Sequence, residues 1–319
     1  IEYQAFGNAE VAVAHSPRAF AGLREQFEAL ELLGVDAELV TADAARERFY
    51  DSTEQYGALA LRPTFGLHPL RYCRGLAAAA ARRGARLHAH SRVIEWTNSP
   101  HGGHTLVTRG GTLRARRVVF ATNGFIDESL HRSFYGRSLP IISAIIVTRP
   151  LTADEIEAQG WRTEHPCYNT RRVLNYYRLL PDGRFMFGGR GQGLGAPADE
   201  SRGYDDLAHA MRAMWPRWAR VEIDYRWHGL ICYTGSLRPG IGVLDDDDSV
   251  WFGFGYHGNG VNNATWAGKQ LADWIGTGRR PQAVPEFVAS LPNRFPLPKM
   301  RTASLRLALK LASWRDRRR

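Results

Sequence analysis

The chain has 319 residues with 44% hydrophobic content, which suffices for one large domain or two smaller ones, and no apolar run approaches the ~18 residues of a membrane span. Its net charge of +10 is concentrated at the end: seven basic residues and one acid lie from Arg301 to Arg319, so the rest of the chain carries only about +4. Because zinc-finger, RNP and helix-turn-helix patterns are also lacking, the sequence argues against a nucleic-acid partner.

The amino-terminal part predicts short strands and helices in alternation. Val11–Val13 is typical of a strand, and Ser16 followed by Pro17 predicts a helix start, with Ser16 as the cap. Apolar residues then recur at helical spacing up to Gly34, where the helix should end. The charged stretch Thr41–Phe49 predicts another short helix.

The next segment predicts a helix followed by a strand. An Ala-rich helix should run from Pro69 to a stop at Gly84, with His68 as a cap or packing group. A strand through Leu87 and Ala89 is expected to follow.

Residues 101–103 and 110–111 predict hairpin turns, and Arg117–Gly124 predicts a buried apolar strand that ends in small polar residues. In open α/β sheets, ligands bind just beyond the carboxyl ends of such strands. The stretch therefore favours a ligand-binding edge, with an ordinary exit from strand to loop as the alternative.

From Leu139 to Arg190 the pattern changes to β. LPIISAIIVTRPL predicts a long strand, and VLNYYRLLPDGRFMFGGR predicts a hairpin that turns at Pro181–Gly183. A helix over Asp205–Trp215 precedes the strand-like VEIDYRWHGLICYTG, and the acidic run Asp245–Asp248 predicts a solvated turn. A mixed β region inserted in an α/β framework is typical of a substrate chamber over a cofactor site.

The stretch Gly253–Gly258 has a G-x-G-x-x-G pattern between a strand-like run and a helix-like run. A dinucleotide-binding turn needs a second parallel strand that ends in Asp or Glu about 20 residues later, whereas here a Pro-rich connection follows. A near-match at 191–196 is followed by Pro197 and acidic residues, so it fails as well. The first stretch still directs free N–H groups and a positive helix end toward any group with negative charge; a close-packed turn is the alternative.

The series GLHPL, VVFATNG, WHGLICYTGSLRPGIG and GYHGNGV, in this order and spacing, resembles the FAD-dependent amine and amino-acid oxidase (DAO) family. That family includes glycine oxidase, sarcosine oxidase and D-amino-acid oxidase. LNYYRLLPDGRFMFGGR, IDYRWHGLICYT and LPNRFPLPKMRTASLR resemble the γ-glutamylputrescine oxidoreductases within it. The resemblance covers essentially the whole chain. It implies a mixed α/β fold, in which an incomplete, doubly wound FAD-binding domain carries an inserted mixed β-sheet substrate domain.

The resemblance divides the chain into alternating parts. We expect substrate-domain residues at 1–57, FAD-binding residues at 58–138, the substrate-domain sheet at 139–238, the last FAD-binding part at 239–283 and a basic tail at 284–319. The family's opening strand, G-x-G-x-x-G turn, helix and acidic residue have no counterpart in this sequence. We therefore expect an amino-terminally truncated chain that holds FAD poorly by itself.

The resemblance also implies which residues contact FAD. Val93 matches the position whose backbone meets the adenine. The strand end beside the ADP half and the turn over the flavin pyrimidine ring are matched by two sets of residues: Ala121, Thr122, Asn123 and Gly124, and then Gly258, Asn259, Gly260 and Val261. Ile231 occupies the position of the covalent flavin cysteine of the sarcosine-oxidase branch, and Cys232 comes one residue later. We therefore expect non-covalent FAD.

The chemistry that the family implies is hydride transfer from the carbon next to nitrogen to flavin N5, while the protein orients the substrate and excludes water. The catalytic candidates are His257, Tyr233, Tyr177 and Arg190. Tyr176 and Trp227 are further candidates for the chamber wall, and Arg178 and Arg190 are candidates to hold a substrate carboxylate. Core packing and a solvated strand face are the alternatives for these side chains.

We therefore expect an oxidoreductase with FAD, a small-molecule amine substrate and oxygen or another electron acceptor. Three widely spaced cysteines fit neither a metal site nor a disulfide framework, which favours the cytoplasm. One alternative is an inactive or split fragment that acts only as a binding or structural piece. Another is a nicotinamide-dependent dehydrogenase that uses Gly253–Gly258. The tail SLRLALKLASWRDRRR is expected to pack on the domain rather than to bind a membrane surface or a partner.

Overall fold

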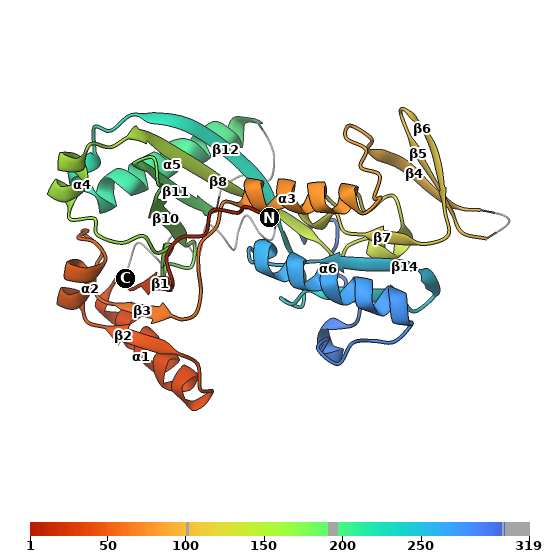
Figure 1. Cartoon of the computed structure of the whole chain (residues 1–319), viewed down its shortest axis with the longest axis horizontal. Coiled ribbons are helices and arrows are strands. Elements are labelled where there is room, and N and C mark those ends of the chain that lie inside the picture. Colours follow the sequence, from red (N-terminus) through yellow and green to blue (C-terminus); the bar gives the residue numbers. More distant parts are fainter. Residues whose placement is uncertain (100–101, 191–196, 302, 304–319) are drawn as a thin grey trace. The chain divides into compact units, whose positions relative to one another are not determined.

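The computed structural model describes residues 1–99, 102–190, 197–301 and 303, with the side chains of 190 and 197–202 excluded. The chain divides into two compact units, shown in Figure 1. Unit 1 contains residues 1–83 and 142–229, and unit 2 contains residues 84–141 and the described part of 230–305. Within the described residues, the chain therefore passes between the units three times.

Unit 1 is built on an eight-stranded sheet with the order β12–β8–β11–β10–β9–β1–β3–β2. Its strands are β1 (Glu10–Val13), β2 (Ala37–Val40), β3 (Ala58–Leu61), β8 (Leu139–Pro150), β9 (Cys167–Asn169), β10 (Asn175–Leu179), β11 (Arg184–Arg190) and β12 (Ile223–Tyr233). Strand β1 runs antiparallel to β3 and parallel to β9, so it joins the first strands of the chain to the later ones. The predicted hairpin at 173–190 is confirmed as β10 and β11.

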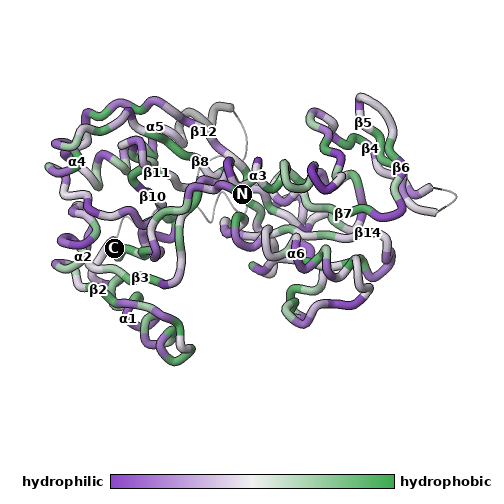
Figure 2. Tube along the Cα trace, in the orientation of Figure 1, coloured by the Kyte–Doolittle hydropathy of each residue, from purple (hydrophilic) through white to green (hydrophobic). Residues whose placement is uncertain are grey.

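The sequence predicts the helices of unit 1 only in part: the first three begin where expected, the helix at 153–159 was not predicted, and the helix expected over Asp205–Trp215 begins at Pro197. They are α1 (Pro17–Leu32), α2 (Ala42–Arg48), α3 (Pro69–Arg82), α4 (Ala153–Gln159) and α5 (Pro197–Met214), followed by the 3-10 turn η3 (Pro216–Trp218). Ser16 Oγ accepts the Ala19 N–H at 3.2 Å, which confirms it as the cap of α1. His68 Nδ1 accepts from the Arg71 N–H in the same way. Hydrophobic residues recur among hydrophilic ones along α1 (Figure 2), which is the pattern of a helix that packs one of its faces.

Aromatic side chains form the core of unit 1. Trp215 and Trp218 are fully buried, and the Trp215 ring contacts Tyr177, Phe185 and Phe187, with centroids 4.8–5.8 Å apart. These three residues alternate along β10 and β11, so they share one face of the sheet. The opposite face carries the residues between them.

Unit 2 contains two three-stranded sheets, with the orders β13–β14–β7 and β4–β5–β6. Their strands are β4 (Val93–Asn98), β5 (His104–Thr108), β6 (Gly111–Ala115), β7 (Val118–Phe120), β13 (Gly240–Leu244) and β14 (Asp247–Phe254). The helical elements are α6 (Gly260–Thr277), η1 (Asn123–Phe125), η2 (Arg132–Phe134) and η4 (Glu286–Val288). Helix α6 packs Ala267 and Leu271 against Ile241 and Trp251. Of the acidic turn predicted over Asp245–Asp248, the first two residues form the turn between β13 and β14, and the last two begin β14.

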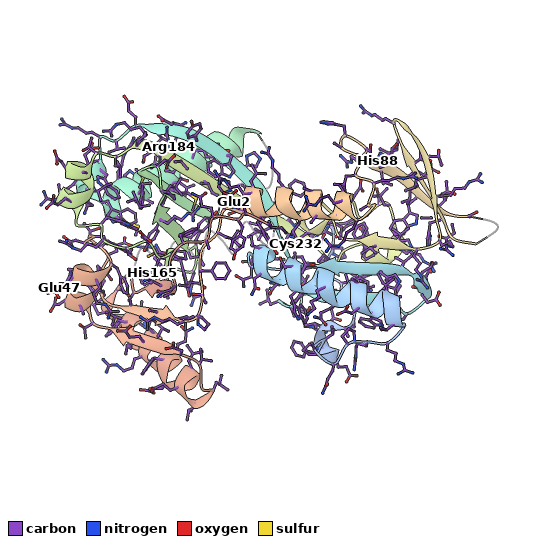
Figure 3. The ribbon with its side chains drawn as sticks, viewed as in Figure 1. Glu2, Glu47, His88, His165, Arg184 and Cys232 are labelled. Atoms are coloured by element: carbon purple, nitrogen blue, oxygen red, sulfur yellow. The ribbon has the colours of Figure 1, made fainter. Side chains whose placement is uncertain are left out.

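One expectation from the sequence is wrong. No strand forms at Leu87 and Ala89: residues 83–92 contain neither helix nor strand, and all of them are exposed, including His88 (Figure 3). The reason is that a strand needs a face that packs against its neighbours, and this exposed stretch has none. The first boundary between the two compact units falls after residue 83, and β3 belongs to the sheet of unit 1 because it pairs with β1. Within the described residues, the later boundaries fall after residues 141 and 229.

None of the helices in the described ranges combines the length and the apolar character that a membrane crossing requires. The predicted amphipathic tail from residue 304 onward and the near-match at 191–196 lie outside the described residues.

Candidate functional site

Two strand ends meet at one edge of unit 2. Strands β7 and β14 are parallel neighbours, with Phe120 opposite Phe252, so their carboxyl ends point the same way. Asn123 follows β7, and its Oδ1 accepts the backbone N–H of Gly255, which follows β14, at 3.0 Å. This bond fixes the spacing of the two loops, and it lies where open α/β sheets bind ligands.

The loop between β14 and α6 has an unusual backbone. Gly255, His257 and Gly258 all have positive φ, at 84°, 55° and 102°. His257 N–H donates to Cys232 O at 3.1 Å, and Asn259 N–H donates to Tyr256 O at 2.9 Å. Since a positive φ favours glycine, the glycines at 255 and 258 serve the turn, and a turn of this shape delivers the chain into α6.

The start of α6 is open to a ligand. Asn259 is the N-cap residue, but its side chain makes no capping bond. A Cβ added to Gly258 or Gly260 would meet no atom within 4 Å, so the backbone borders free space at both positions. Exposed N–H groups and the positive end of the helix dipole favour a negatively charged group here.

His257 is held in one orientation and kept neutral. The Thr234 hydroxyl donates to Arg238 O at 2.8 Å, so its oxygen accepts from His257 Nε2–H at 3.2 Å. The Nδ1 atom then carries the lone pair. Burial is the main influence on the His257 side chain and lowers its pKa below the usual value. Tyr233 lies beside it, with the ring centroids 4.9 Å apart.

The remaining residues expected near FAD have different environments. Ala121 and Thr122 are exposed, and Val93 is half-buried at the first position of β4. Gly124 is buried, and a Cβ there would lie 2.6 Å from Leu230 O. Gly124 is therefore required for close packing against β12, whereas Ala121 and Thr122 are accessible to a ligand.

The candidates in unit 1 divide into core and surface. Tyr177 is fully buried in the aromatic core, where its hydroxyl is 2.6 Å from that of Tyr50. We therefore leave Tyr177 out of the site. Tyr176 is on the opposite face and shares a hydrogen bond of 2.8 Å with Ser143. Arg190 ends β11 with its backbone opposite Ser143, and its side chain is not among those described.

Cys232, labelled in Figure 3, is fully buried, and burial raises the pKa of its thiol to about 12. A buried, protonated thiol is a poor nucleophile. It also faces the apolar cluster of Phe120, Phe134 and Phe254, so its environment is that of a core residue.

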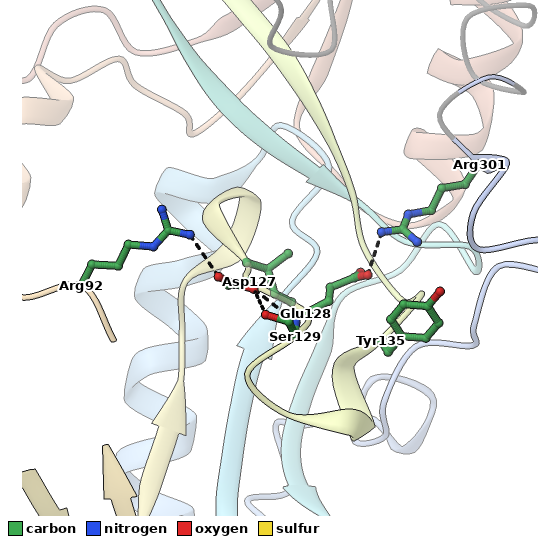
Figure 4. Close-up of a pocket in the computed structure, with 7 residues that line it drawn as sticks. Arg92, Asp127, Glu128, Ser129, Tyr135 and Arg301 are labelled. Atoms are coloured by element: carbon green, nitrogen blue, oxygen red, sulfur yellow. Dashed lines mark hydrogen bonds and ion pairs between the residues drawn. The ribbon is translucent and has the colours of Figure 1, made fainter. Parts of the chain in front are cut away.

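A polar pocket of about 460 Å³ lies beside the 126–135 loop of unit 2 (Figure 4). Glu128 and Arg301 form an ion pair at 2.7 Å with both side chains mostly buried, and Glu128 also accepts from Ser138 Oγ at 2.7 Å. Arg92 pairs with Asp127 at 3.0 Å. The two ion pairs leave the pocket without a net charge. The pair between Glu128 and Arg301 attaches the segment near Arg301 to the 126–135 loop. Glu128 carries no signal in the sequence, because no local pattern links it to Arg301, which lies far along the chain.

The glycine pattern at 253–258 lacks the context of a dinucleotide fingerprint in the described part of the chain. After α6, residues 278–301 contain the turn η4 but no strand. A second parallel strand with a terminal carboxylate is what binds the ribose in such a unit.

Known proteins support this assignment of the fold. The FAD dependent oxidoreductase (DAO) family matches residues 3–274. The γ-glutamylputrescine oxidoreductase of Escherichia coli (strain K12) is 32% identical over 296 residues, which cover 91% of this chain and 66% of that protein. The protein described as "Probable oxidoreductase OrdL" of Haemophilus influenzae is 32% identical over 219 residues, which cover 66% of this chain and 47% of that protein.

A similar fold is seen in a solved structure. The crystal structure of glycine oxidase from Geobacillus kaustophilus matches with a TM-score of 0.76 at 18% identity, over 91% of this chain and 76% of that one. The chain spans about half to two thirds of the length of the two curated relatives. The expected mixed α/β fold is confirmed, and the chain belongs to the FAD dependent oxidoreductase family.

Proposed function

We propose that this chain is part of a cytoplasmic FAD-dependent oxidoreductase that oxidises the CH–NH bond of an amine or amino acid. The γ-glutamylputrescine oxidoreductase of E. coli, at 32% identity, suggests an amine substrate of that type. The observation that carries the proposal is the joined edge of β7 and β14, which presents the uncapped start of α6.

The residues at that edge fit the flavin end of FAD. The open backbone at Gly258 and Gly260 would accept the pyrimidine edge of the ring, and N–H groups at the start of α6 would stabilise its negative charge. Ala121 and Thr122 are accessible for the ADP half, and Val93 for the adenine. Asn123 acts indirectly, because its side chain is committed to Gly255.

We propose non-covalent attachment. Ile231 stands where a linking cysteine would be expected, and the buried Cys232 thiol, with its pKa raised to about 12, is poorly suited to form a covalent bond.

The cofactor, when bound, supplies the hydride acceptor. The chain supplies orientation and proton handling. The lowered pKa of His257 favours its neutral form, whose Nδ1 would accept a proton from the substrate ammonium and so leave the neutral amine that can be oxidised. Tyr233, packed beside this imidazole, would limit the access of water.

The proposal is tested by flavin reduction. Binding of FAD to the chain is measured first, and the chain is then titrated anaerobically, with FAD kept present, with γ-glutamylputrescine, putrescine, sarcosine and glycine. We expect loss of the oxidised flavin absorbance with at least one amine. Readmitting oxygen and measuring peroxide would then distinguish oxygen from another electron acceptor.

A folded chain that binds FAD but is never reduced by an amine would contradict the proposed reaction. A folded chain that binds no FAD would favour the alternative in which it acts only as a binding or structural piece. Binding of NADH in place of FAD would favour a nicotinamide-dependent dehydrogenase.

A further inference from the structure

Residues 290–295 of unit 2 form a segment without helix or strand that is nevertheless held in place. It begins the stretch LPNRFPLPKM, which resembles the γ-glutamylputrescine oxidoreductases but has no role in the proposed reaction. The Phe295 N–H donates to Gly136 O at 2.8 Å. Because a segment outside regular structure has no ladder of backbone hydrogen bonds, its position depends on individual bonds of this kind.

Arg137 supplies a second bond to the 290–295 segment. Its Nη1–H donates to Pro292 O, and its Nε–H donates to Ser133 O at 2.7 Å, so the side chain joins the segment to the loop before β8. Burial lowers the pKa of Arg137, and Arg294 lowers it further, but a guanidinium stays charged at neutral pH. Bonds from a charged donor are stronger than those between neutral groups, so Arg137 holds this carbonyl firmly.

The 290–295 segment packs against both ends of the 234–239 turn, which follows β12. A Cβ on Gly240 would come within 2.4 Å of the Pro292 ring, so only glycine allows the ring to lie so close. A Cβ on Gly235 would lie 3.5 Å from the segment, which is ordinary contact. The position of the turn therefore depends on the position of the segment.

The 234–239 turn contains the hydroxyl that orients His257. Thr234 Oγ1 donates to Arg238 O at 2.8 Å and accepts from the Arg238 N–H at 3.3 Å. This leaves one lone pair for the Nε2–H of His257. The Thr234 methyl group also lies against Gly255, where a Cβ would come within 2.4 Å of it. A movement of the turn would therefore separate the hydroxyl from the imidazole.

We propose that Arg137 is a positioning residue for His257. By holding the 290–295 segment it keeps the 234–239 turn in place, and the turn holds the imidazole in the tautomer whose Nδ1 is free. The described bonds of the Arg137 side chain go to backbone carbonyls, so it acts through the segment and the turn. The consequence for amine oxidation rests on the proposed function, in which Nδ1 of His257 accepts the substrate proton.

The test is the titration of His257 in the full 319-residue chain without flavin. The ring signals are followed by NMR, and the His257 signal is identified by its absence from His257→Gln. Arg137→Met should raise the pKa of His257 toward the ordinary value of about 6.5, because a displaced turn admits water to a ring whose pKa burial lowers. Arg137→Lys keeps one charged donor and should raise it less.

The titration has controls inside and outside the chain. Tyr233 and Arg238 are the titratable residues with described contacts to the ring or its pKa, and these variants retain both. His165 belongs to unit 1 and burial lowers its pKa as well, so its titration should not change. Arg132→Met is the matched variant, because it removes an exposed arginine of the same loop whose side chain pairs with Asp246. It should leave the His257 titration unchanged.

Gly240→Ala disturbs the same contact from the other side. Its Cβ would displace the Pro292 ring from the turn, so it should raise the pKa of His257 as Arg137→Met does. Thermal unfolding shows which variants are folded; if Arg137→Met is not, Arg137→Lys and Gly240→Ala provide the comparison. An unchanged His257 titration in the folded variants overturns the inference, as does an equal shift in Arg132→Met.

Because this titration needs neither flavin nor turnover, it separates the two proposals. A raised His257 pKa in a chain whose flavin no amine reduces would support the positioning role and contradict the proposed reaction. If amines do reduce the flavin, the acidic limb of the kcat/KM profile should move to higher pH in Arg137→Met, since His257 must be neutral to accept the proton. Flavin reduction with an unshifted limb and an unshifted titration would support the reaction and overturn the positioning role.

Discussion

At the scale of single residues, the loops beside α6 depend on a few side chains that fix backbone atoms. Asn123 holds Gly255, and Thr234 orients the His257 ring. Asn123 itself has a φ of 46°, a conformation that asparagine tolerates better than most residues. These contacts are local, so their contributions can be measured by single substitutions.

Replacing Asn123 with Ala should lower the free energy of unfolding by roughly 1.5–3 kcal/mol, because the bond to Gly255 is lost and a positive φ is imposed on alanine. Urea unfolding measures the change. Asn123→Asp keeps the accepting oxygen and should retain most of the stability. A loss as large in the Asp variant as in the Ala variant would show that this hydrogen bond is not the cause.

His257 should make the stability depend on pH. Because burial lowers its folded pKa below the unfolded value of about 6.5, its contribution is complete above that value and is lost as the pH falls through the folded pKa. Burial also lowers the pKa values of His131 and His165. The chain should therefore lose stability as the pH falls below about 6.5.

His257→Gln keeps a donor for Thr234 but does not titrate. Urea unfolding at about pH 7.5 and pH 5 should therefore show a smaller loss of stability in this variant than in the unaltered chain. An identical loss in both proteins would mean that the His257 pKa does not change on folding.

At the scale of helices and strands, the sequence predicted most elements whose signals are local. Ser16, His68 and Gly84 marked helix ends because caps and stops act within one turn. The prediction of a strand through Leu87 and Ala89 was wrong, because the alternation of apolar and polar residues does not by itself specify a pairing partner. Likewise, the hydrogen bond between Asn123 and Gly255 forms only because β7 and β14 are neighbours in the sheet. The local sequence around either residue does not indicate that pairing.

Helix α6 offers a matched pair of glycines. Gly258→Ala places a Cβ on a φ of 102° and should cost roughly 1–2 kcal/mol of unfolding free energy. Gly268 lies within α6 with free space around it, so Gly268→Ala should stabilise the chain by roughly 0.5–1 kcal/mol. Thermal unfolding compares the stabilities of the two variants. If both substitutions stabilised the chain, a side chain at position 258 would not strain the backbone there.

The paired hydroxyls of Tyr50 and Tyr177 test whether Tyr177 belongs to the core. Tyr177→Phe should lower the unfolding free energy by roughly 1–3 kcal/mol, because it leaves the buried Tyr50 hydroxyl without its partner. Tyr50→Phe combined with Tyr177→Phe should recover part of that loss, and the double-mutant cycle measures the coupling. Additive losses would argue that the hydroxyls do not interact.

At the scale of the whole molecule, each unit is assembled from separate stretches of chain. The sheet of unit 1 joins β1, β2 and β3 to strands that follow residue 138, and unit 2 joins β7 to β14. Family resemblance predicts alternating substrate and FAD-binding parts, and in the structure the first crossing between the units comes after β3 has paired with β1. Residue 83 is the first crossing point in the structure.

Limited trypsin digestion should cut first after Arg83 or Arg86, because residues 83–92 are exposed and lack regular structure. The two pieces should still elute together under native conditions, since β1 remains paired with β9 across the cut. Separation into two species on gel filtration would show that this strand pairing does not hold unit 1 together. A denaturing gel of the same sample confirms that cutting has occurred.

The pairing of Val11 with Cys167 has a consequence for protein synthesis. At ~5–20 residues per second, a ribosome needs roughly 8–30 s to make the chain between these two residues. Throughout that interval the nascent β1 has one hydrogen-bonding edge without its neighbour, and an open edge of apolar residues invites pairing with other chains. We therefore expect newly made copies to be prone to association until β9 emerges, and the yield of folded chain should fall when translation is dense and temperature is high.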